Sequence, residues 1–147
     1  MQQITLRAAA KLNMTLDITG VRPDGYHLLQ MVMQTVSLYD TLTLRREERI
    51  SLLCDHLPNP DNLAWRAAEA FFAHTGVKGG VQITLDKQIP IQSGMAGGSA
   101  DAAAVLKGLD ILYEPHLGLP ALRELGLSLG ADVPYCLMGG TALVEGI

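Results

Sequence analysis

Three glycines and a serine cluster in the stretch "IPIQSGMAGGSADAAA", residues 89–104, where they could bring the backbone close to an anion. Gly94, Gly97 and Gly98 carry no side chain that would block such an approach, and the alanines that follow predict a helix. Ser99 would add a hydroxyl at the start of that helix, where free N–H groups and the positive end of the dipole attract anions. The pattern indicates phosphate binding, with a plain turn before an alanine helix as the alternative.

The best-known phosphate-binding signatures do not decide between these two interpretations. A Walker A loop needs a Lys-Ser/Thr pair after its last glycine, whereas Ser99-Ala100 follow Gly98 in this chain. A dinucleotide-binding loop needs GxGxxG, and Gly94-Met95-Ala96-Gly97 breaks that spacing. The spacing alone therefore leaves both interpretations open.

Strands are expected before and after this stretch. Polar and apolar residues alternate over residues 11–19, the period of a half-buried strand, which puts Lys11 and Asn13 on one polar face. Residues 31–44 are rich in β-formers but broken at Tyr39-Asp40, which predicts two strands. Further strands are expected over residues 79–87, with Val81, Ile83 and Leu85 facing inward, and over residues 139–147.

Three helices are expected between the strands. Asp61 or Asn62 can cap a helix that ends at Gly76. The glycine stretch leads into a second helix that continues through Tyr113, and leucines at helical spacing predict a third, closed near Gly130. The order β-β-β-α-β-α-α-β, with the strands clustered first, predicts an α+β fold.

The bulk properties favour a cytoplasmic globular protein of one domain. The chain has 147 residues, of which 48% are hydrophobic, and a net charge of −4, which argues against nucleic-acid binding through a broad basic face. No apolar run approaches membrane-spanning length, and Arg7, Lys11 and Asp17 interrupt any signal-peptide core. Cys54 and Cys136 form no CxxC pair, so the sequence predicts neither a zinc site nor a disulfide framework.

Residues 87–109 resemble the proline–glycine–serine–alanine motif of the GHMP family of small-molecule kinases. Segments 8–44, 61–71 and 129–147 are similar to other parts of one branch, in the same order. The sequence PDGYH, residues 23–27, narrows the match to the branch that acts on 4-diphosphocytidyl-2-C-methyl-D-erythritol.

The resemblance implies that residues 1–147 form the N-terminal, ATP-binding domain of such a kinase, with a C-terminal domain missing as its intramolecular partner. The implied fold is like ribosomal protein S5 domain 2, a mixed β-sheet packed by helices with a left-handed βαβ crossover. The implied reaction transfers the γ-phosphate of ATP, accompanied by Mg²⁺, to the 2-hydroxyl of 4-diphosphocytidyl-2-C-methyl-D-erythritol, in the non-mevalonate route to isoprenoid precursors. Both ligands are small molecules, and neither a nucleic acid nor a membrane is an expected partner. We expect the chain alone to have little turnover.

Asp132 matches the catalytic aspartate of the family, and Lys11 matches its partner lysine. A carboxylate can orient the attacking hydroxyl and accept its proton, while an ammonium can stabilise the charge that develops. A helix cap is the alternative for Asp132, and a solvated strand-face lysine is the alternative for Lys11. Asn13 matches a substrate contact, and Tyr26 and His27 match the pair that meets the cytidine diphosphate end of the substrate.

The resemblance also implies an ATP site, made by Asn62, Lys87, Pro90, Gly94, Met95, Ala96, Gly97, Gly98 and Ser99. Asn62 as an N-cap and Lys87 as a solvated strand end are the structural alternatives. Ser99 is also the possible Mg²⁺ ligand. Ala96 and Ala100 depart from the family loop, which has glycine and a second serine there, and the lost hydroxyl would weaken a phosphate or metal contact.

Three other functions remain open on sequence grounds. The chain could belong to another GHMP kinase, of the mevalonate, homoserine or galactose type, against which PDGYH counts. It could be a non-catalytic nucleotide-binding module, although Lys11 and Asp132 are both present. An S5-like RNA-binding module is disfavoured by the acidic balance.

Overall fold

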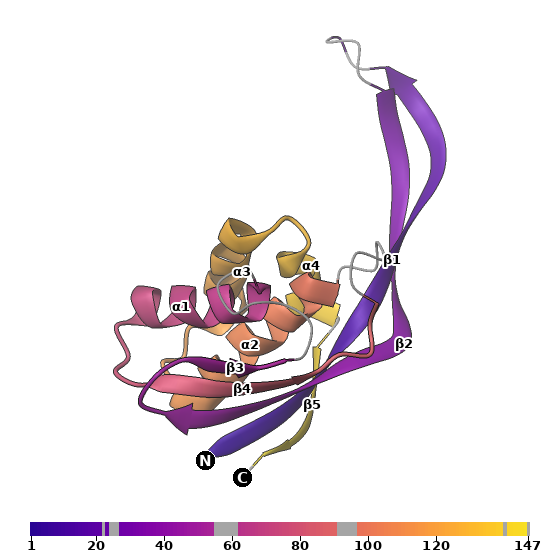
Figure 1. The fold of residues 1–147 in the computed structure, drawn as a ribbon. Helices are drawn as coiled ribbons and strands as arrows, with labels where there is room; N and C mark the ends of the chain where they lie inside the picture. Colours follow the sequence, from indigo (N-terminus) through magenta and orange to yellow (C-terminus); the bar gives the residue numbers. More distant parts are fainter. Residues whose placement is uncertain (22, 24–26, 55–61, 91–96, 140, 147) are drawn as a thin grey trace.

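The computed structural model describes residues 1–21, 23, 27–54, 62–90, 97–139 and 141–146; over 12–21, 27–36 and 141–146 only the backbone is described. Within these residues five strands form one sheet, and four helices cover one of its faces (Figure 1). The elements in chain order are β1 (Gln3–Val21), β2 (His27–Glu47), β3 (Ser51–Leu53), α1 (Leu63–Thr75), β4 (Gly80–Asp86), α2 (Gly97–Tyr113), α3 (Gly118–Leu129), α4 (Val133–Gly139) and β5 (Thr141–Gly146). The expected α+β class is confirmed. None of the described helices is long and apolar enough to cross a bilayer.

The sheet is mixed, with the strand order β3-β4-β2-β1-β5. β1 pairs antiparallel with β2 and β5, and β2 pairs antiparallel with β4. β3 and β4 are parallel, so α1 lies within a βαβ crossover between them. The left-handedness that the family resemblance implies for such a unit stays a prediction.

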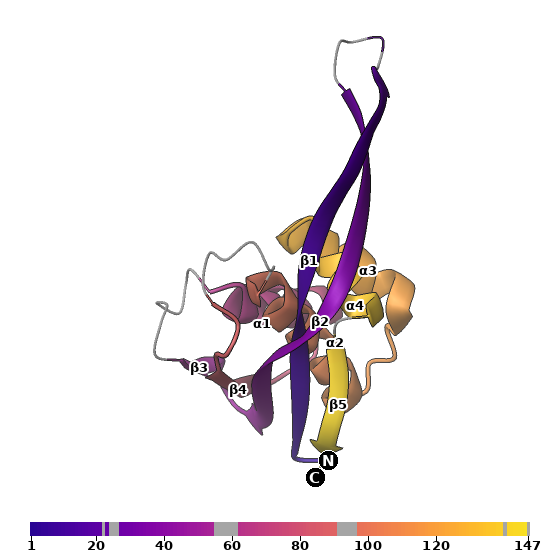
Figure 2. The same ribbon diagram turned by 90° about the vertical axis from the view of Figure 1, so that its right-hand side faces the viewer.

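β1 and β2 form a long hairpin whose far end projects beyond the helical layer (Figures 1 and 2). The expected break at Tyr39-Asp40 is wrong, because β2 runs unbroken from His27 to Glu47. A register shift replaces the break: Ala9 pairs with Tyr39, but Lys11 pairs with Thr35. The pairing is irregular here while the chain continues as a strand, which is what a β-bulge produces.

Two further elements were not expected from the sequence, β3 and α4. β3 has three residues and α4 has seven, so neither is long enough to show a clear hydrophobic period. β1 also begins earlier than expected, at Gln3.

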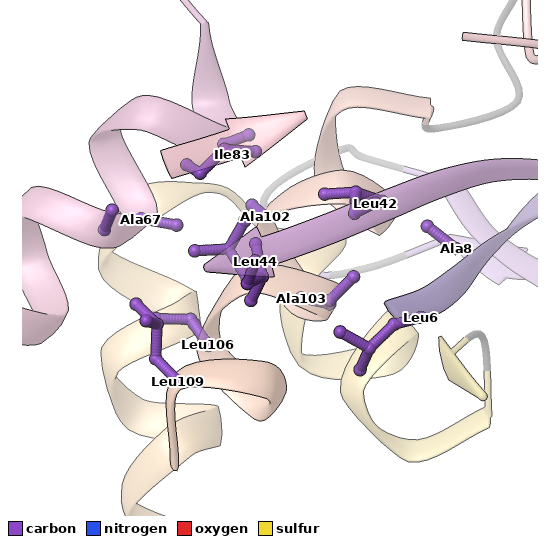
Figure 3. Packing of buried hydrophobic residues seen from close by; sticks show 14 of the residues in the cluster. Leu6, Ala8, Leu42, Leu44, Ala67, Ile83, Ala102, Ala103, Leu106 and Leu109 are labelled. Atoms are coloured by element: carbon purple, nitrogen blue, oxygen red, sulfur yellow. The ribbon is translucent and has the colours of Figure 1, made fainter. Parts of the chain in front are cut away.

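The core lies between the sheet and the first two helices (Figure 3). Leu6, Leu42 and Leu44 of β1 and β2 pack against α2, which is buried on most of its circumference. A Cβ on Gly108 would lie 2.5 Å from Leu44 Cδ1 and 2.8 Å from Leu6 Cδ1, so these two leucine side chains pack directly against the backbone of α2. Val81, Ile83 and Leu85, which were expected to face inward, are buried, as are Ala102, Val105, Leu106 and Leu109 of α2.

The expected helix ends are confirmed for α1 and α3. The side chain of Asn62 accepts a hydrogen bond from Ala64 N–H at 2.8 Å, which makes Asn62 the N-cap of α1. Gly76 ends α1 with φ 68°, the left-handed conformation that glycine adopts without strain. α3 ends at Leu129, and Gly130 N–H donates to the carbonyl of Gly126.

Candidate active site

Lys11 and Asp132 lie together, with Lys11 Nζ 3.4 Å from Asp132 Oδ1. The Lys11 side chain is only 2% exposed, whereas that of Asp132 is 38% exposed. The alternative of a solvated strand-face lysine is therefore wrong. The buried ammonium of Lys11 fixes the position of the Asp132 carboxylate, and the exposed part of that carboxylate remains open to a ligand.

The irregular pairing of β1 explains how Lys11 comes to face the helices. Ile4, Leu6 and Ala8 are buried at every second position, and this period alone would turn Lys11 to the opposite face. The register shift between Ala9 and Lys11 interrupts the alternation, so Lys11 reaches the residue that precedes α4.

Asp132 is held by the turn between α3 and α4. Val133 N–H donates to the carbonyl of Gly130, and Cys136 N–H donates to the carbonyl of Asp132, which opens α4. Asp132 thus stands at the cap position that the alternative interpretation assigned to it. Its backbone starts the helix while its carboxylate contacts Lys11, so the two roles are compatible.

The start of α2 lies close to this turn. A Cβ on Gly130 would lie 3.9 Å from Ser99 Oγ, so Ser99 is a neighbour of the segment that carries Asp132. A Cβ on Gly98 would lie 3.4 Å from Leu63 Cδ1, which brings the N-terminal ends of α1 and α2 together. Both helix dipoles therefore present their positive ends to this region, which favours an anion there.

Cys136 is buried beside the Lys11–Asp132 pair. Burial, together with the charges of Asp132 and Asp101, raises the pKa of the Cys136 thiol to about 11, against the opposing charge of Lys11. The thiol is neutral near pH 7, so Cys136 packs at the site and is no nucleophile there.

Lys87 lies in a second polar cluster, with Asp40 and Asp101. Its Nζ is 2.6 Å from Asp40 Oδ2 and 2.9 Å from Asp101 Oδ2, and its side chain is 8% exposed. The alternative of a solvated strand end is wrong. Neither aspartate was predicted to have a role at the site, although an acidic residue inside a β-rich run and another inside an alanine run were the signals available.

The two aspartates of this cluster have opposite pKa shifts. Burial pushes the pKa of Asp40 upward, but hydrogen bonds from Asp101, Lys87 and two backbone N–H groups outweigh it and hold this pKa below its ordinary value. Burial, together with the hydrogen bond to Asp40, raises the pKa of Asp101 well above its ordinary value, against the opposing charge of Lys87. Asp101 Oδ1 has no hydrogen-bond partner among the described residues. Burial lowers the pKa of Lys87, but its interactions with Asp101 and Asp40 outweigh burial and raise this pKa above its ordinary value.

The remaining predicted site residues are placed less completely. Tyr26, Gly94, Met95 and Ala96 lie outside the described residues. Asn13 and His27 are described only by their backbone, where Asn13 pairs with Met33 and His27 pairs with Val21. Pro90 is exposed at the entrance of the glycine stretch, and Asn62 is the buried N-cap of α1. Their roles in binding stay predictions.

Known kinases share both the sequence and the fold of this chain. A protein of Alkaliphilus metalliredigens named 4-diphosphocytidyl-2-C-methyl-D-erythritol kinase is 47% identical, over all of this chain and 52% of that protein. A protein of the same name from Gloeobacter violaceus is 50% identical, over 99% of this chain and 49% of that protein. The chain thus spans about half the length of the curated relatives it matches.

Solved structures extend the comparison. The crystal structure of a 4-(cytidine 5'-diphospho)-2C-methyl-D-erythritol kinase superposes with a TM-score of 0.79 and 38% identity, over 97% of this chain and 52% of that one. The mevalonate kinase of Methanococcus jannaschii superposes with a TM-score of 0.72 over 97% of this chain and 53% of that one, and its 15% identity supports a shared fold alone. A sequence model described as "GHMP kinases N terminal domain" matches residues 62–140, more than half of the 147 residues. On that match, the chain belongs to the GHMP kinase family.

Proposed function

We propose that the full-length protein transfers the γ-phosphate of ATP to the 2-hydroxyl of 4-diphosphocytidyl-2-C-methyl-D-erythritol, in the non-mevalonate route to isoprenoid precursors. The observation that carries this proposal is the contact between the buried ammonium of Lys11 and the accessible carboxylate of Asp132. It occurs in a chain 47% identical over its whole length to a protein that bears the name of this kinase. The free thiols of Cys54 and Cys136 suit a reducing, cytoplasmic compartment.

In this proposal Asp132 orients the 2-hydroxyl and accepts its proton as the oxygen attacks the γ-phosphorus. Lys11 holds Asp132 in position and stabilises negative charge on the attacking oxygen. Because the Asp132 side chain is 38% exposed, it is open to a hydroxyl without a rearrangement of the turn. The bound substrate would extend along the site toward Asn13, Tyr26 and His27, which we assign to its cytidine diphosphate end.

We assign ATP to the region where the starts of α1 and α2 meet. The glycines let the backbone approach the phosphates, and the helix N-terminus supplies N–H donors. The proposed ATP-binding residues are Asn62, Lys87, Pro90, Gly94, Met95, Ala96, Gly97, Gly98 and Ser99. Among them Lys87 is nearly buried, and its ammonium is held by Asp40 and Asp101.

Magnesium is assigned to the phosphates of bound ATP. The described residues include no group of three or more His, Cys, Asp or Glu side chains that could hold a metal ion, so they offer no preformed cage. A hydroxyl among phosphate oxygens and waters suits Mg²⁺, which keeps several waters in such sites, and Ser99 is the protein ligand we assign. There the ion would neutralise charge on the transferring phosphoryl group.

We propose that residues 1–147 are the N-terminal domain of a two-domain enzyme, since the matched relatives are about twice as long. The C-terminal domain would be its intramolecular partner and would complete the substrate cleft. The chain alone is then expected to turn over slowly, which a kinase assay of residues 1–147 beside the full-length protein checks. Equal kcat and KM for both would overturn this part of the proposal.

A substrate panel tests the function. The full-length protein is incubated with ATP and, separately, 4-diphosphocytidyl-2-C-methyl-D-erythritol, mevalonate or homoserine, and the phosphorylated product is identified by ³¹P NMR. We expect the diphosphocytidyl compound alone to be phosphorylated. Faster phosphorylation of mevalonate or homoserine would make it another GHMP kinase. Binding of ATP with no product from any substrate would favour a nucleotide-binding module.

A further inference from the structure

We infer that Asp40 is a positioning residue for the glycine-rich stretch, because its carboxylate binds residues 87–89 directly and is linked through Lys87 to Asp101 of α2. This link itself follows from distances among described residues. Its purpose, to hold the stretch ready for phosphate, rests on the proposed function.

On the N-terminal side, Asp40 takes hydrogen bonds from three consecutive residues. Its Oδ1 accepts from Gln88 N–H at 2.7 Å and from Ile89 N–H at 2.8 Å. Its Oδ2 lies 2.6 Å from Lys87 Nζ. Asp40 is fully buried on β2, which is paired with a strand on each side, so these bonds anchor the entrance of the stretch to the rigid sheet.

On the C-terminal side, Lys87 connects Asp40 to α2. Its ammonium also donates to Asp101 Oδ2 at 2.9 Å, within the second turn of that helix. A Cβ on Gly97 would lie 3.2 Å from Lys87 Nζ and 2.9 Å from Ile89 Cγ2. The first residue of α2 therefore sits directly on the anchored segment, and only glycine permits this approach.

Burying the cluster of Asp40, Lys87 and Asp101 would be energetically unfavourable if it served packing alone. Three ionisable side chains are almost inaccessible, and burying charges costs free energy that apolar side chains of the same volume would not. Here the ionised Asp40 accepts hydrogen bonds from backbone N–H groups and pairs with the lysine that also contacts α2. That use fixes the geometry of a segment rather than filling a core.

Three variants of the full-length protein and a control separate these roles. Asp40→Asn and Lys87→Met break this set of contacts, and Asp101→Asn changes a carboxyl group whose pKa burial raises well above its ordinary value. Asp86→Asn is the matched control, because Asp86 is exposed, precedes Lys87 in the chain and accepts a hydrogen bond from the side chain of Gln88. Backbone hydrogen exchange without nucleotide, ATP binding by calorimetry, and steady-state kinetics are measured on each.

We expect Asp40→Asn to weaken ATP binding and raise KM for ATP about tenfold, the loss of one to two charge-assisted hydrogen bonds. kcat at saturating ATP should stay within about threefold of wild type, since the ammonium and carboxylate that act on the hydroxyl are untouched. Exchange of the amides at residues 88–89 and 97–101 should become faster. Asp101→Asn should change these quantities less than Asp40→Asn, and Asp86→Asn should leave them at wild-type values.

Unchanged exchange and unchanged ATP affinity in Asp40→Asn would overturn the inference, as would equal losses in Asp86→Asn. If Asp40→Asn does not fold, hydrogen exchange at residues 97–101 in Lys87→Met decides, because ATP affinity in that variant would also report the ATP contact proposed for Lys87. If the wild-type protein binds no ATP, the proposed function fails, while exchange at residues 88–89 and 97–101 still decides whether Asp40 holds the stretch.

Discussion

A double-mutant cycle on Lys11 and Asp132 tests whether these residues act as one catalytic unit. Lys11→Met removes the ammonium but keeps an unbranched side chain in a site where lysine is 2% exposed. Asp132→Asn keeps the shape of the side chain but removes its ability to accept a proton. Both single variants and the double variant are made in the full-length protein.

The size of each effect follows from the geometry. At 3.4 Å two unit charges attract by ~1 kcal/mol in water and ~5 kcal/mol at an effective dielectric of about 20. Because Asp132 is more than a third exposed, the lower figure governs folding, and we expect a coupling of about 1 kcal/mol in unfolding free energy. For turnover, loss of the base should lower kcat by about 10² to 10⁴-fold, and loss of the ammonium by about 10² to 10³-fold.

The double variant carries the decisive measurement. If the two groups serve one proton transfer, the fold-loss in kcat of the double variant should equal that of the less active single variant. Independent groups would instead give a fold-loss equal to the product of the two single losses. ADP release is followed with a coupled pyruvate kinase–lactate dehydrogenase assay, and urea unfolding reports stability. Lys78→Met, at an exposed lysine, is the control for a lost positive charge. Fully multiplicative losses in kcat, or an Asp132→Asn variant with wild-type kcat, would refute the assignment.

Three further predictions follow from single positions. Gly97→Ala should destabilise the protein in urea unfolding, since its Cβ would lie 2.9 Å from Ile89 Cγ2, whereas Gly98→Ala has only Leu63 at 3.4 Å and should keep its stability but lose ATP affinity. Asp101→Asn should become more stable relative to wild type as pH rises above about 4. The raised pKa of Asp101 means that the folded wild type retains a proton that the unfolded chain releases, which destabilises the wild type. Urea unfolding at a series of pH values measures this difference. Asn62→Ala should cost about 1 kcal/mol through the lost cap of α1, while Asn62→Asp should keep the cap; equal stability of both in thermal unfolding would contradict the cap's contribution.

Local patterns in the sequence were enough to predict most of the elements. The alternation at Val81, Ile83 and Leu85 and the cap signals at Asn62 and Gly76 act within a few residues of one another. Each depends on the chain itself rather than on a distant partner. The structure confirms these predictions for that reason.

The predicted strand break at Tyr39-Asp40 failed because the conformation there depends on distant partners. Tyr39-Asp40 predicts a strand break because aspartate is disfavoured in strands, yet Asp40 is stabilised there by Lys87 and by the amides of Gln88 and Ile89. No local pattern carries that information, since the partners lie more than 40 residues away in the chain. The face of Lys11 was likewise set by a bulge against β2, which periodicity within β1 cannot reveal.

The Lys11–Asp132 pair and the cluster of Asp40, Lys87 and Asp101 differ in their exposure to solvent. More than a third of the Asp132 side chain is exposed, which suits the proposed contact with a hydroxyl, while Asp40 is fully buried, which suits the proposed positioning role. Ala100 fits the same distinction. It is fully buried, so the serine that the family has at this position would place its hydroxyl in the core of this chain rather than toward a phosphate. Ser99, partly exposed and near the Asp132 turn, is the hydroxyl that can serve the ligand, and the loss of the second serine therefore need not weaken phosphate binding.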